Sequence, residues 1–172
     1  LKRITKAVDP DLELAAISDR VLGMGGPALL FENVVGSPVP VAVNLLGTVE
    51  RVTWSMGLDS IEQLEKLGEK LSKLQNPAPP KNLKKTIEYG GLIWDLLKAF
   101  PDRELIPPCH QRILKGDLVD LDTLPLIRPW PGDAGKVITF GLVITKDPET
   151  NTPNVGVYRL QQQSKQTMTV HW

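Results

Sequence analysis

Hydrophobic and polar residues follow strand-like and helix-like patterns over the first 45 residues. Asp9 and Pro10 suit the N-cap and the first position of a helix, and apolar residues then recur at helical spacing until the glycine-rich stretch that begins at Gly23. Short apolar runs lie on either side of this helix. We therefore expect a β-α-β-β arrangement, with strands over Leu1–Val8, Ala28–Asn33 and Val39–Leu45.

The middle of the chain has a helical pattern. Thr48 is an expected N-cap of a helix that ends near Gly57, and Asp59 or Ser60 caps a longer one. The longer helix carries a leucine-rich stripe that we interpret as core packing: Ile61, Leu64, Leu67, Leu71 and Leu74. Proline-rich breaks at 76–80 and 101–108 surround an interrupted helical segment over Lys81–Phe100.

The C-terminal region has a β pattern. Val137–Lys146 is rich in β-branched residues with both faces partly apolar, as in a strand buried on two sides. Asp147 and Pro148 end this strand with turn chemistry. We expect two more antiparallel strands, over Asn154–Gln161 and Thr167–Trp172.

Composition excludes several classes of protein. Lys plus Arg and Asp plus Glu number 20 each, so the formal net charge is zero and the basic stripe of a nucleic-acid-binding protein is not expected. The sequence has no apolar run long enough for a transmembrane helix and no signal peptide pattern. A single cysteine, Cys109, excludes an internal disulfide and fits a reducing compartment. Because the chain starts at Leu1 and ends at Trp172, apparently inside a strand, we interpret it as a piece of a longer protein.

Two groups of reactive residues are expected to be structural. Cys109 and His110 are adjacent, and no second cysteine gives zinc-site spacing. Asp117, Asp120 and Asp122 fit a solvated turn with caps better than a calcium loop. No GxGxxG loop follows a predicted strand, so nucleotide binding of the Rossmann type is not expected.

The strongest candidate site is Asn154, Arg159 and His171. Side chains alternate along a strand, so Arg159 shares a face with Val155 and Val157. A buried arginine is costly unless it meets an anion, and its planar fork suits a phosphate or a carboxylate. The alternative is a strand-edge arginine whose side chain reaches solvent.

The sequence resembles the UbiD family of decarboxylases, which use prenylated FMN. The ordered motifs that carry the resemblance run from residue 1 to 172. They include ITKAVDPDLELAAISDRVL, GGPALLFENV, VPVAVNLLGT, RVTWSMG, PAPP, PPCHQRIL, GDLVDLDTLPLIRPWPGD, ITFGLVITKDP, PNVGVYRLQ and TVHW.

The resemblance implies roles for particular residues. The asparagine of the family's N-x-G-[IV]-Y-R motif, here Asn154, binds a manganese ion that bridges the cofactor phosphate. The arginine of the motif, here Arg159, also helps to polarise the substrate carboxylate. The implied contacts of prenylated FMN are Val157, Tyr158, Arg159, His171 and Trp172. Potassium is a second candidate ion.

The resemblance also implies an organisation and an activity. We expect an α+β fold, with an N-terminal α/β region over 1–105 and the start of a split β-barrel flavin-binding domain over 106–172. The implied reaction is non-oxidative decarboxylation of an aromatic acid, with 4-hydroxy-3-polyprenylbenzoate of quinone biosynthesis as the expected substrate. The family's second metal ligand and acid–base carboxylate match no residue of this chain, so we expect the isolated chain to be inactive.

The expected partners follow from this chemistry. They are the aromatic acid, a flavin prenyltransferase that supplies the cofactor, and further copies of the chain in a homo-oligomer; no nucleic acid is expected. The expected location is the cytoplasm, with peripheral membrane contact through a lipid-tailed substrate as an extension. Two alternatives stay open: an FMN-binding split-barrel oxidoreductase, and a non-catalytic assembly module that uses helix 61–74 as its contact surface.

Overall fold

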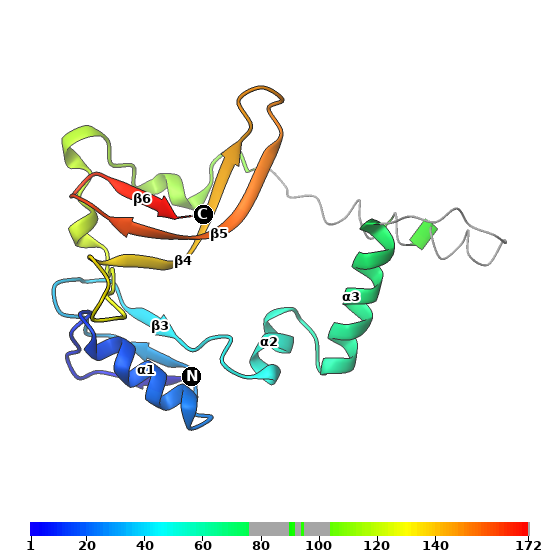
Figure 1. Ribbon diagram of the computed structural model, residues 1–172, viewed down its shortest axis with the longest axis horizontal. Coiled ribbons are helices and arrows are strands. Elements are labelled where there is room, and N and C mark those ends of the chain that lie inside the picture. Colours follow the sequence, from blue (N-terminus) through cyan, green and yellow to red (C-terminus); the bar gives the residue numbers. More distant parts are fainter. Residues whose placement is uncertain (76–89, 92–93, 95–103, 172) are drawn as a thin grey trace. The chain divides into compact units, whose positions relative to one another are not determined.

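The chain forms two compact units in the computed structural model (Figure 1), which describes residues 1–75, 90–91, 94 and 104–171. The first unit combines Leu1–Gly47 with Leu114–Trp172, and the second is Thr48–Ile113. The predicted domain boundary between 105 and 106 falls inside the second unit, and that division stays a prediction. The expected break at 76–80, most of the expected segment Lys81–Phe100, and Trp172 lie outside the described residues.

The first unit begins with a small mixed sheet. Strands β1 (Lys2–Ile4) and β2 (Leu29–Phe31) pair in parallel, and β2 pairs antiparallel with β3 (Val41–Val43). Helix α1 (Glu13–Gly23) connects the two parallel strands, as the predicted β-α-β-β order requires (Figure 1). The core of this region consists of Val8, Leu14, Leu29, Phe31 and Val34.

Helix α1 starts later than predicted. Asp9 is not its N-cap, since the helix begins at Glu13 and the Asp9 carboxylate instead accepts the backbone N–H of Asp11 at 2.8 Å. The backbone N–H of Leu12 donates to the carbonyl of Arg128 (2.9 Å), and Arg128 N–H donates to the carbonyl of Pro10 (3.0 Å). These bonds tie residues 10–12 to residue 128, and Leu12 takes a positive φ of 67°, so the first helical turn begins only at Glu13.

The second unit contains helices α2 (Val49–Ser55) and α3 (Ile61–Gln75). Thr48 caps α2 as predicted, since its hydroxyl accepts the backbone N–H of Arg51. The leucine-rich stripe of α3 packs only in part, because Ile61 and Leu71 are exposed.

The first unit also contains an antiparallel meander of three strands. It consists of β4 (Val137–Lys146), β5 (Pro153–Gln162) and β6 (Met168–His171), in the order β4-β5-β6. The register between β4 and β5 shifts between Ile138 and Gly141, which marks a β-bulge. Short 3₁₀ turns occur before the meander and in the second unit, at Gly116–Leu118, Leu121–Thr123 and Pro108–Gln111.

The turn between β4 and β5 has the predicted chemistry. The Asp147 carboxylate accepts the backbone N–H groups of Glu149 and Thr150, each at 2.8 Å. These two bonds hold the pKa of Asp147 below its ordinary value. The backbone of Asn151 takes a left-handed conformation, with φ at 58°, that asparagine tolerates well.

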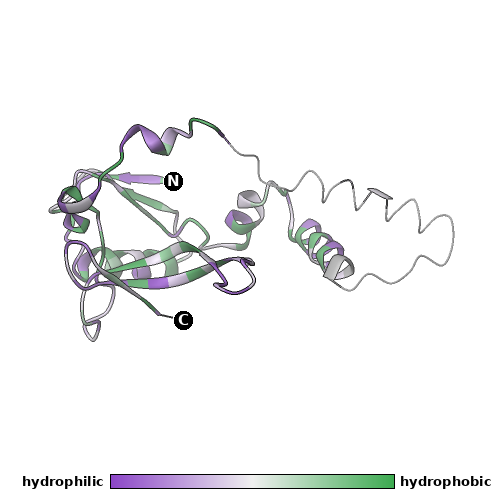
Figure 2. Ribbon diagram, turned by 90° about the horizontal axis from the view of Figure 1, so that it is seen from above, coloured by the Kyte–Doolittle hydropathy of each residue, from purple (hydrophilic) through white to green (hydrophobic). Residues whose placement is uncertain are grey.

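The prediction that β4 is buried on two sides is wrong within the described residues. Leu142 and Ile144 are 69% and 74% exposed, and Phe140 is exposed as well. Figure 2 shows apolar positions along the strands of both sheets; the first sheet buries Leu29 and Phe31, whereas the described part of the second sheet buries only Val137, at the start of β4. The mixed α+β class is confirmed, whereas the split barrel stays a prediction.

Candidate functional site

The meander has one open and one partly covered face. Leu142 pairs with Val157 and Ile144 pairs with Val155, and directly paired residues share a face. We call this side the open face, because its apolar residues are exposed. The partly covered face carries half-buried residues that include Val143, Gly156, Tyr158 and Leu160.

Arg159 and His171 extend the open face toward β6. Arg159 lies two residues beyond Val157 on β5, and the register pairs Arg159 with His171 of β6. Both therefore lie on the open face. His171 is exposed, and among the described residues its imidazole has no hydrogen-bond or ion-pair partner. Arg159 and His171 thus adjoin the apolar strip formed by Leu142, Ile144, Val155 and Val157.

Arg159 meets an anion inside the chain. Its Nη2 atom lies 2.6 Å from Oδ1 of Asp133, and the side chains are 41% and 17% exposed. Nη2 is buried without an aligned hydrogen bond, so the contact is an ion pair of imperfect geometry. Arg159 thus meets a carboxylate of the chain while part of its side chain reaches solvent, and its role in binding a ligand anion stays a prediction.

The remaining predicted residues lie elsewhere. Asn154 is exposed at the far end of β5 opposite Thr145, and Tyr158 lies on the partly covered face. Five residues of strand separate Asn154 from Arg159 by about 16 Å along the chain. The structure therefore brings together Val157, Arg159 and His171, and separates them from Asn154 and Tyr158.

One edge of β5 is unpaired near the site. β6 pairs only with Arg159–Gln162, so the part of β5 from Pro153 to Tyr158 has no strand on that side among the described residues. Such an edge leaves backbone N–H and C=O groups available for a ligand or another strand.

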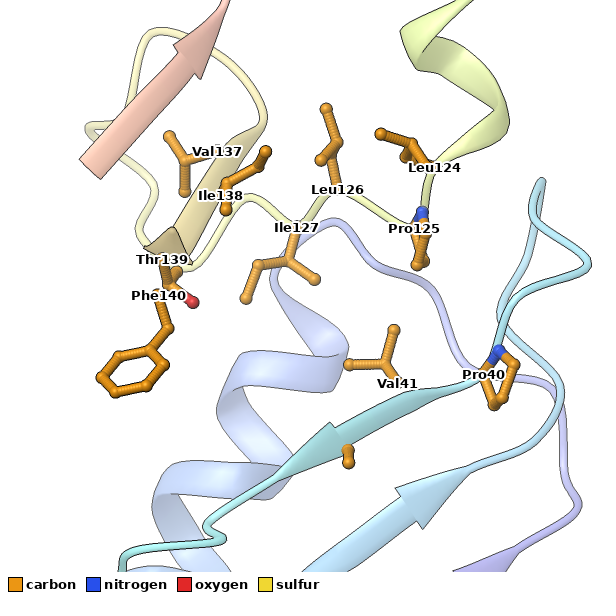
Figure 3. A pocket seen from close by; sticks show the side chains of 11 residues that line it. Pro40, Val41, Leu124, Pro125, Leu126, Ile127, Val137, Ile138, Thr139 and Phe140 are labelled. Carbon is orange, nitrogen blue, oxygen red and sulfur yellow. The ribbon is translucent and has the colours of Figure 1, made fainter. Parts of the chain in front are cut away.

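An apolar cavity of about 360 Å³ lies beside the start of β4. Figure 3 shows Val41 of β3 and Ile127 projecting into the same space, with Thr139 supplying a hydroxyl at one end. The lining comes from residues 40–42, 124–127 and 137–140. The cavity suits an apolar group and offers few polar partners.

Two family models match most of the chain. Residues 1–71 match the 3-octaprenyl-4-hydroxybenzoate carboxy-lyase N-terminal domain, and residues 103–172 match the Rift-related domain of the same carboxy-lyase. The chain belongs to the UbiD family.

Individual relatives support this membership. The chain is 63% identical over 172 residues to the uncharacterized protein sll0936 of Synechocystis sp., a match that covers all of this chain and 34% of the relative. It is 28% identical to the UbiD-class enzyme HmfF from Pelotomaculum thermopropionicum in complex with FMN, with a TM-score of 0.69 over 99% of this chain and 33% of HmfF. An evolved dimeric form of HmfF was solved with prenylated FMN.

A third relative is the vanillic acid decarboxylase of Sedimentibacter hydroxybenzoicus in open form. It is 27% identical, with a TM-score of 0.72 over 99% of this chain and 35% of the decarboxylase. The chain thus spans about a third of the length of the relatives it matches.

The donor set of this UbiD-family chain is incomplete for manganese. Residues 1–75, 90–91, 94 and 104–171 contain no group of three His, Cys, Asp or Glu side chains that could hold a metal ion. The carboxylate of Asp120 is engaged by the backbone N–H of Asp122 and by Lys165, which lower its pKa. The predicted turn with caps is confirmed for this aspartate.

The described residues fit a flavin better than a metal. The open face offers an exposed apolar strip and an arginine with unused donors, and β5 has an unpaired edge. The Tyr158 ring packs over Gly156, where a Cβ atom would overlap it, so this tyrosine is fixed on the partly covered face. Trp172, the last predicted flavin contact, lies outside the described residues.

Sequence reasoning missed Asp133 as part of the site. The residue ends the Trp130–Asp133 turn, where its carboxylate accepts the Trp130 N–H at 3.1 Å. Aspartate is common in turns after a Pro-Gly pair, so the pattern explains Asp133 without indicating its ion pair with Arg159. The requirement of Arg159 for an anion was the available signal, but pattern alone could not identify a partner 26 residues away.

Proposed function

We propose that the natural protein carrying this chain is a prenylated-FMN-dependent carboxy-lyase that releases carbon dioxide from an aromatic acid. Membership of the UbiD family supports the reaction class. The similar enzymes HmfF, solved with prenylated FMN, and vanillic acid decarboxylase support the cofactor and the aromatic substrate.

Arg159 at the end of the apolar strip carries the proposal. One edge of its guanidinium faces Asp133, and no hydrogen bond joins Nε or Nη1 to another described residue. Each of these N–H groups can donate a charge-assisted hydrogen bond to a carboxylate or phosphate oxygen. An aromatic acid presents this combination of an apolar ring and a carboxylate.

The apolar strip and the unpaired edge support flavin binding. An isoalloxazine ring is flat and largely apolar, and its burial on Leu142 and Val157 would remove exposed apolar surface from water. The unpaired edge of β5 also supports the proposed split barrel, because further strands could pair with β5 where β6 does not. The cofactor contacts on this side are Val157, Arg159 and His171.

The proposed chemistry divides between cofactor and protein. Prenylated FMN, when bound, supplies an electron sink for the electron pair left by the departing carbon dioxide. Arg159 binds and orients the substrate carboxylate, and the adjacent apolar residues exclude water from the reacting carbon. We place the carboxylate that protonates this carbon outside the present chain.

Asn154 would contribute one oxygen ligand to a manganese ion. The described residues supply no further ligands beside it, so the remaining ligands must come from other sources, including the cofactor phosphate. No step of the proposed mechanism depends on this metal or on potassium.

We further propose 4-hydroxy-3-polyprenylbenzoate as the substrate, in quinone biosynthesis. The descriptions of both matched family models name the octaprenyl form of this acid. A flavin prenyltransferase would supply the cofactor, and further copies of the chain would form a homo-oligomer. The protein would work in the cytoplasm and reach a membrane surface through the lipid tail of the substrate; no described helix is long and apolar enough to cross a membrane.

The test is carbon dioxide release from 4-hydroxy-3-prenylbenzoate by the natural protein, produced with a flavin prenyltransferase and supplied with manganese. We expect release, and we expect Arg159→Ala to reduce it at least about a hundredfold, as for a lost orienting group. Arg3→Ala is the matched control, because Arg3 forms a surface pair with Glu32.

Each negative result of this assay would contradict a different part of the proposal. Retained prenylated flavin without carbon dioxide release would contradict the substrate but keep the cofactor. No retained flavin would contradict the cofactor site and favour an assembly module. Reduction of FMN by a nicotinamide would instead favour an oxidoreductase.

A further inference from the structure

The turn that holds Asp133 is fixed independently of Arg159. The Asp133 backbone N–H donates to the Trp130 carbonyl, and one carboxylate oxygen accepts the Trp130 N–H, both at 3.1 Å. The other carboxylate oxygen faces Arg159. Because the carboxylate is already oriented by its own turn, it can act as an anchor for a mobile side chain.

The contact engages one nitrogen of the Arg159 guanidinium and leaves the other two without a partner among the described residues. Nη2 is buried against the 17%-exposed Asp133, whereas the whole Arg159 side chain is 41% exposed. Nε and Nη1 have no partner within the described part of the chain. An arginine held at Nη2 loses less side-chain entropy when its remaining N–H groups bind a ligand.

A second Asp–Arg pair of the same unit shows a contrasting arrangement. Asp11 binds Arg128 through two hydrogen bonds, from Nε at 2.7 Å and from Nη2 at 3.0 Å. These bonds raise the pKa of Arg128, with Asp133 as a weaker contributor. The bidentate pair occupies Nε and Nη2 together, whereas Asp133 contacts Arg159 through Nη2 alone, so Arg128 acts as a structural tie between residues 11 and 128.

We propose that Asp133 is a positioning residue for Arg159, holding Nη2 of the guanidinium so that the N–H groups of Nε or Nη1 are presented to an anionic group of the ligand. The inference rests on the proposed function, since it takes Arg159 as the ligand-binding residue. The anion is a carboxylate or a phosphate oxygen, from the aromatic acid or from the flavin nucleotide.

The test is a double-mutant cycle on equilibrium binding in the natural protein. One titration uses FMN with the flavin-free protein, and the other uses 4-hydroxybenzoate with the protein loaded with ordinary FMN. Asp133→Asn keeps an acceptor for the Trp130 N–H and removes the charge that faces Arg159. We expect this substitution to lower the affinity for one of the two ligands on the order of fivefold, about the effect of one partly exposed ion pair.

The coupling to Arg159 distinguishes positioning from a general effect. In the Arg159→Ala background, Asp133→Asn should change neither affinity, and Asp133→Glu should recover part of the loss when Arg159 is present. Asp11→Asn is the matched control and should change neither affinity in either background. A lower affinity for FMN identifies the phosphate as the anion that Arg159 binds. A lower affinity for 4-hydroxybenzoate alone identifies the carboxylate.

Several results would overturn the proposal. Unchanged affinities in Asp133→Asn would show that Arg159 needs no anchor. Tighter binding would show that Asp133 competes with the ligand, and equal weakening with and without Arg159 would show a general structural effect. If Arg159→Ala alone changes neither affinity and leaves carbon dioxide release intact, the proposed function fails first.

Discussion

In the first sheet, Leu29 is 2% exposed and Phe31 is fully buried, although each strand has only three residues. In the second sheet, two strands have ten residues each, yet Leu142 and Ile144 remain largely exposed. Strand length therefore does not decide burial here. The first sheet has α1 and its loops to cover it, whereas the open face of the second is covered within the described residues only near Val137 and Arg159, and not at Leu142 and Ile144.

The comparison assigns different tasks to the two sheets. Exposed apolar patches of this kind mark surfaces that bind a ligand or another part of a protein. The first sheet supplies the buried core of the unit. The second sheet presents an apolar strip and Arg159. Its exposed apolar residues stabilise the protein only when a ligand or another segment removes them from water.

The largest expected difference between the sheets is in stability. Phe31→Ala should lower the free energy of unfolding by about 3–5 kcal/mol, because it leaves a cavity in a packed core. Phe140→Ala should change it by less than about 1 kcal/mol, as for a surface substitution. Urea denaturation of the two variants measures both values, and equal losses would refute the distinction between the sheets.

Much of this arrangement could be predicted from local pattern. The bounds of β4 match the prediction, because the β-branched run ends at Asp147, whose side chain then closes the turn. Thr48 caps α2 for the same local reason. Turn and cap chemistry depends on residues a few positions apart, so a sequence carries it directly.

The predictions that were wrong or incomplete depend on contacts between residues that are distant in the sequence. Asp9 fails as an N-cap because residue 128 binds the backbone of residues 10–12. The exposure of Leu142 depends on what covers β4, and the ion pair of Arg159 depends on a turn that precedes β4. Alternation predicts which side chains share a face, but it cannot predict what lies against that face.

Acidic pH is expected to have a smaller effect, on the stability of the turn between β4 and β5. The folded-state pKa of Asp147 is lowered by the N–H groups of Thr150 and Glu149, so its stabilising contribution is present above the unfolded value of about 3.9 and is lost as pH falls through the lower folded value. Hydrogen exchange of these two amides, corrected for intrinsic rates, should show reduced protection below about pH 4.

The matched variant for this experiment is Asp147→Asn, which keeps a side-chain acceptor but does not titrate. Its amide protection at the turn should not change over the same pH range. The same acid-induced loss in both proteins would mean that the carboxylate of Asp147 does not control the turn.

The central claim is that the open face of the second sheet becomes covered when the natural protein binds its flavin. Thiol labelling tests this directly, with Val157→Cys on the open face, Glu149→Cys in the exposed turn as control, and Cys109→Ser in both. With prenylated flavin bound, we expect Val157→Cys to react at least about tenfold more slowly than without it, and Glu149→Cys to react equally in both states. Equal, fast labelling of Val157→Cys in both states would contradict the claim and leave the open face as ordinary surface.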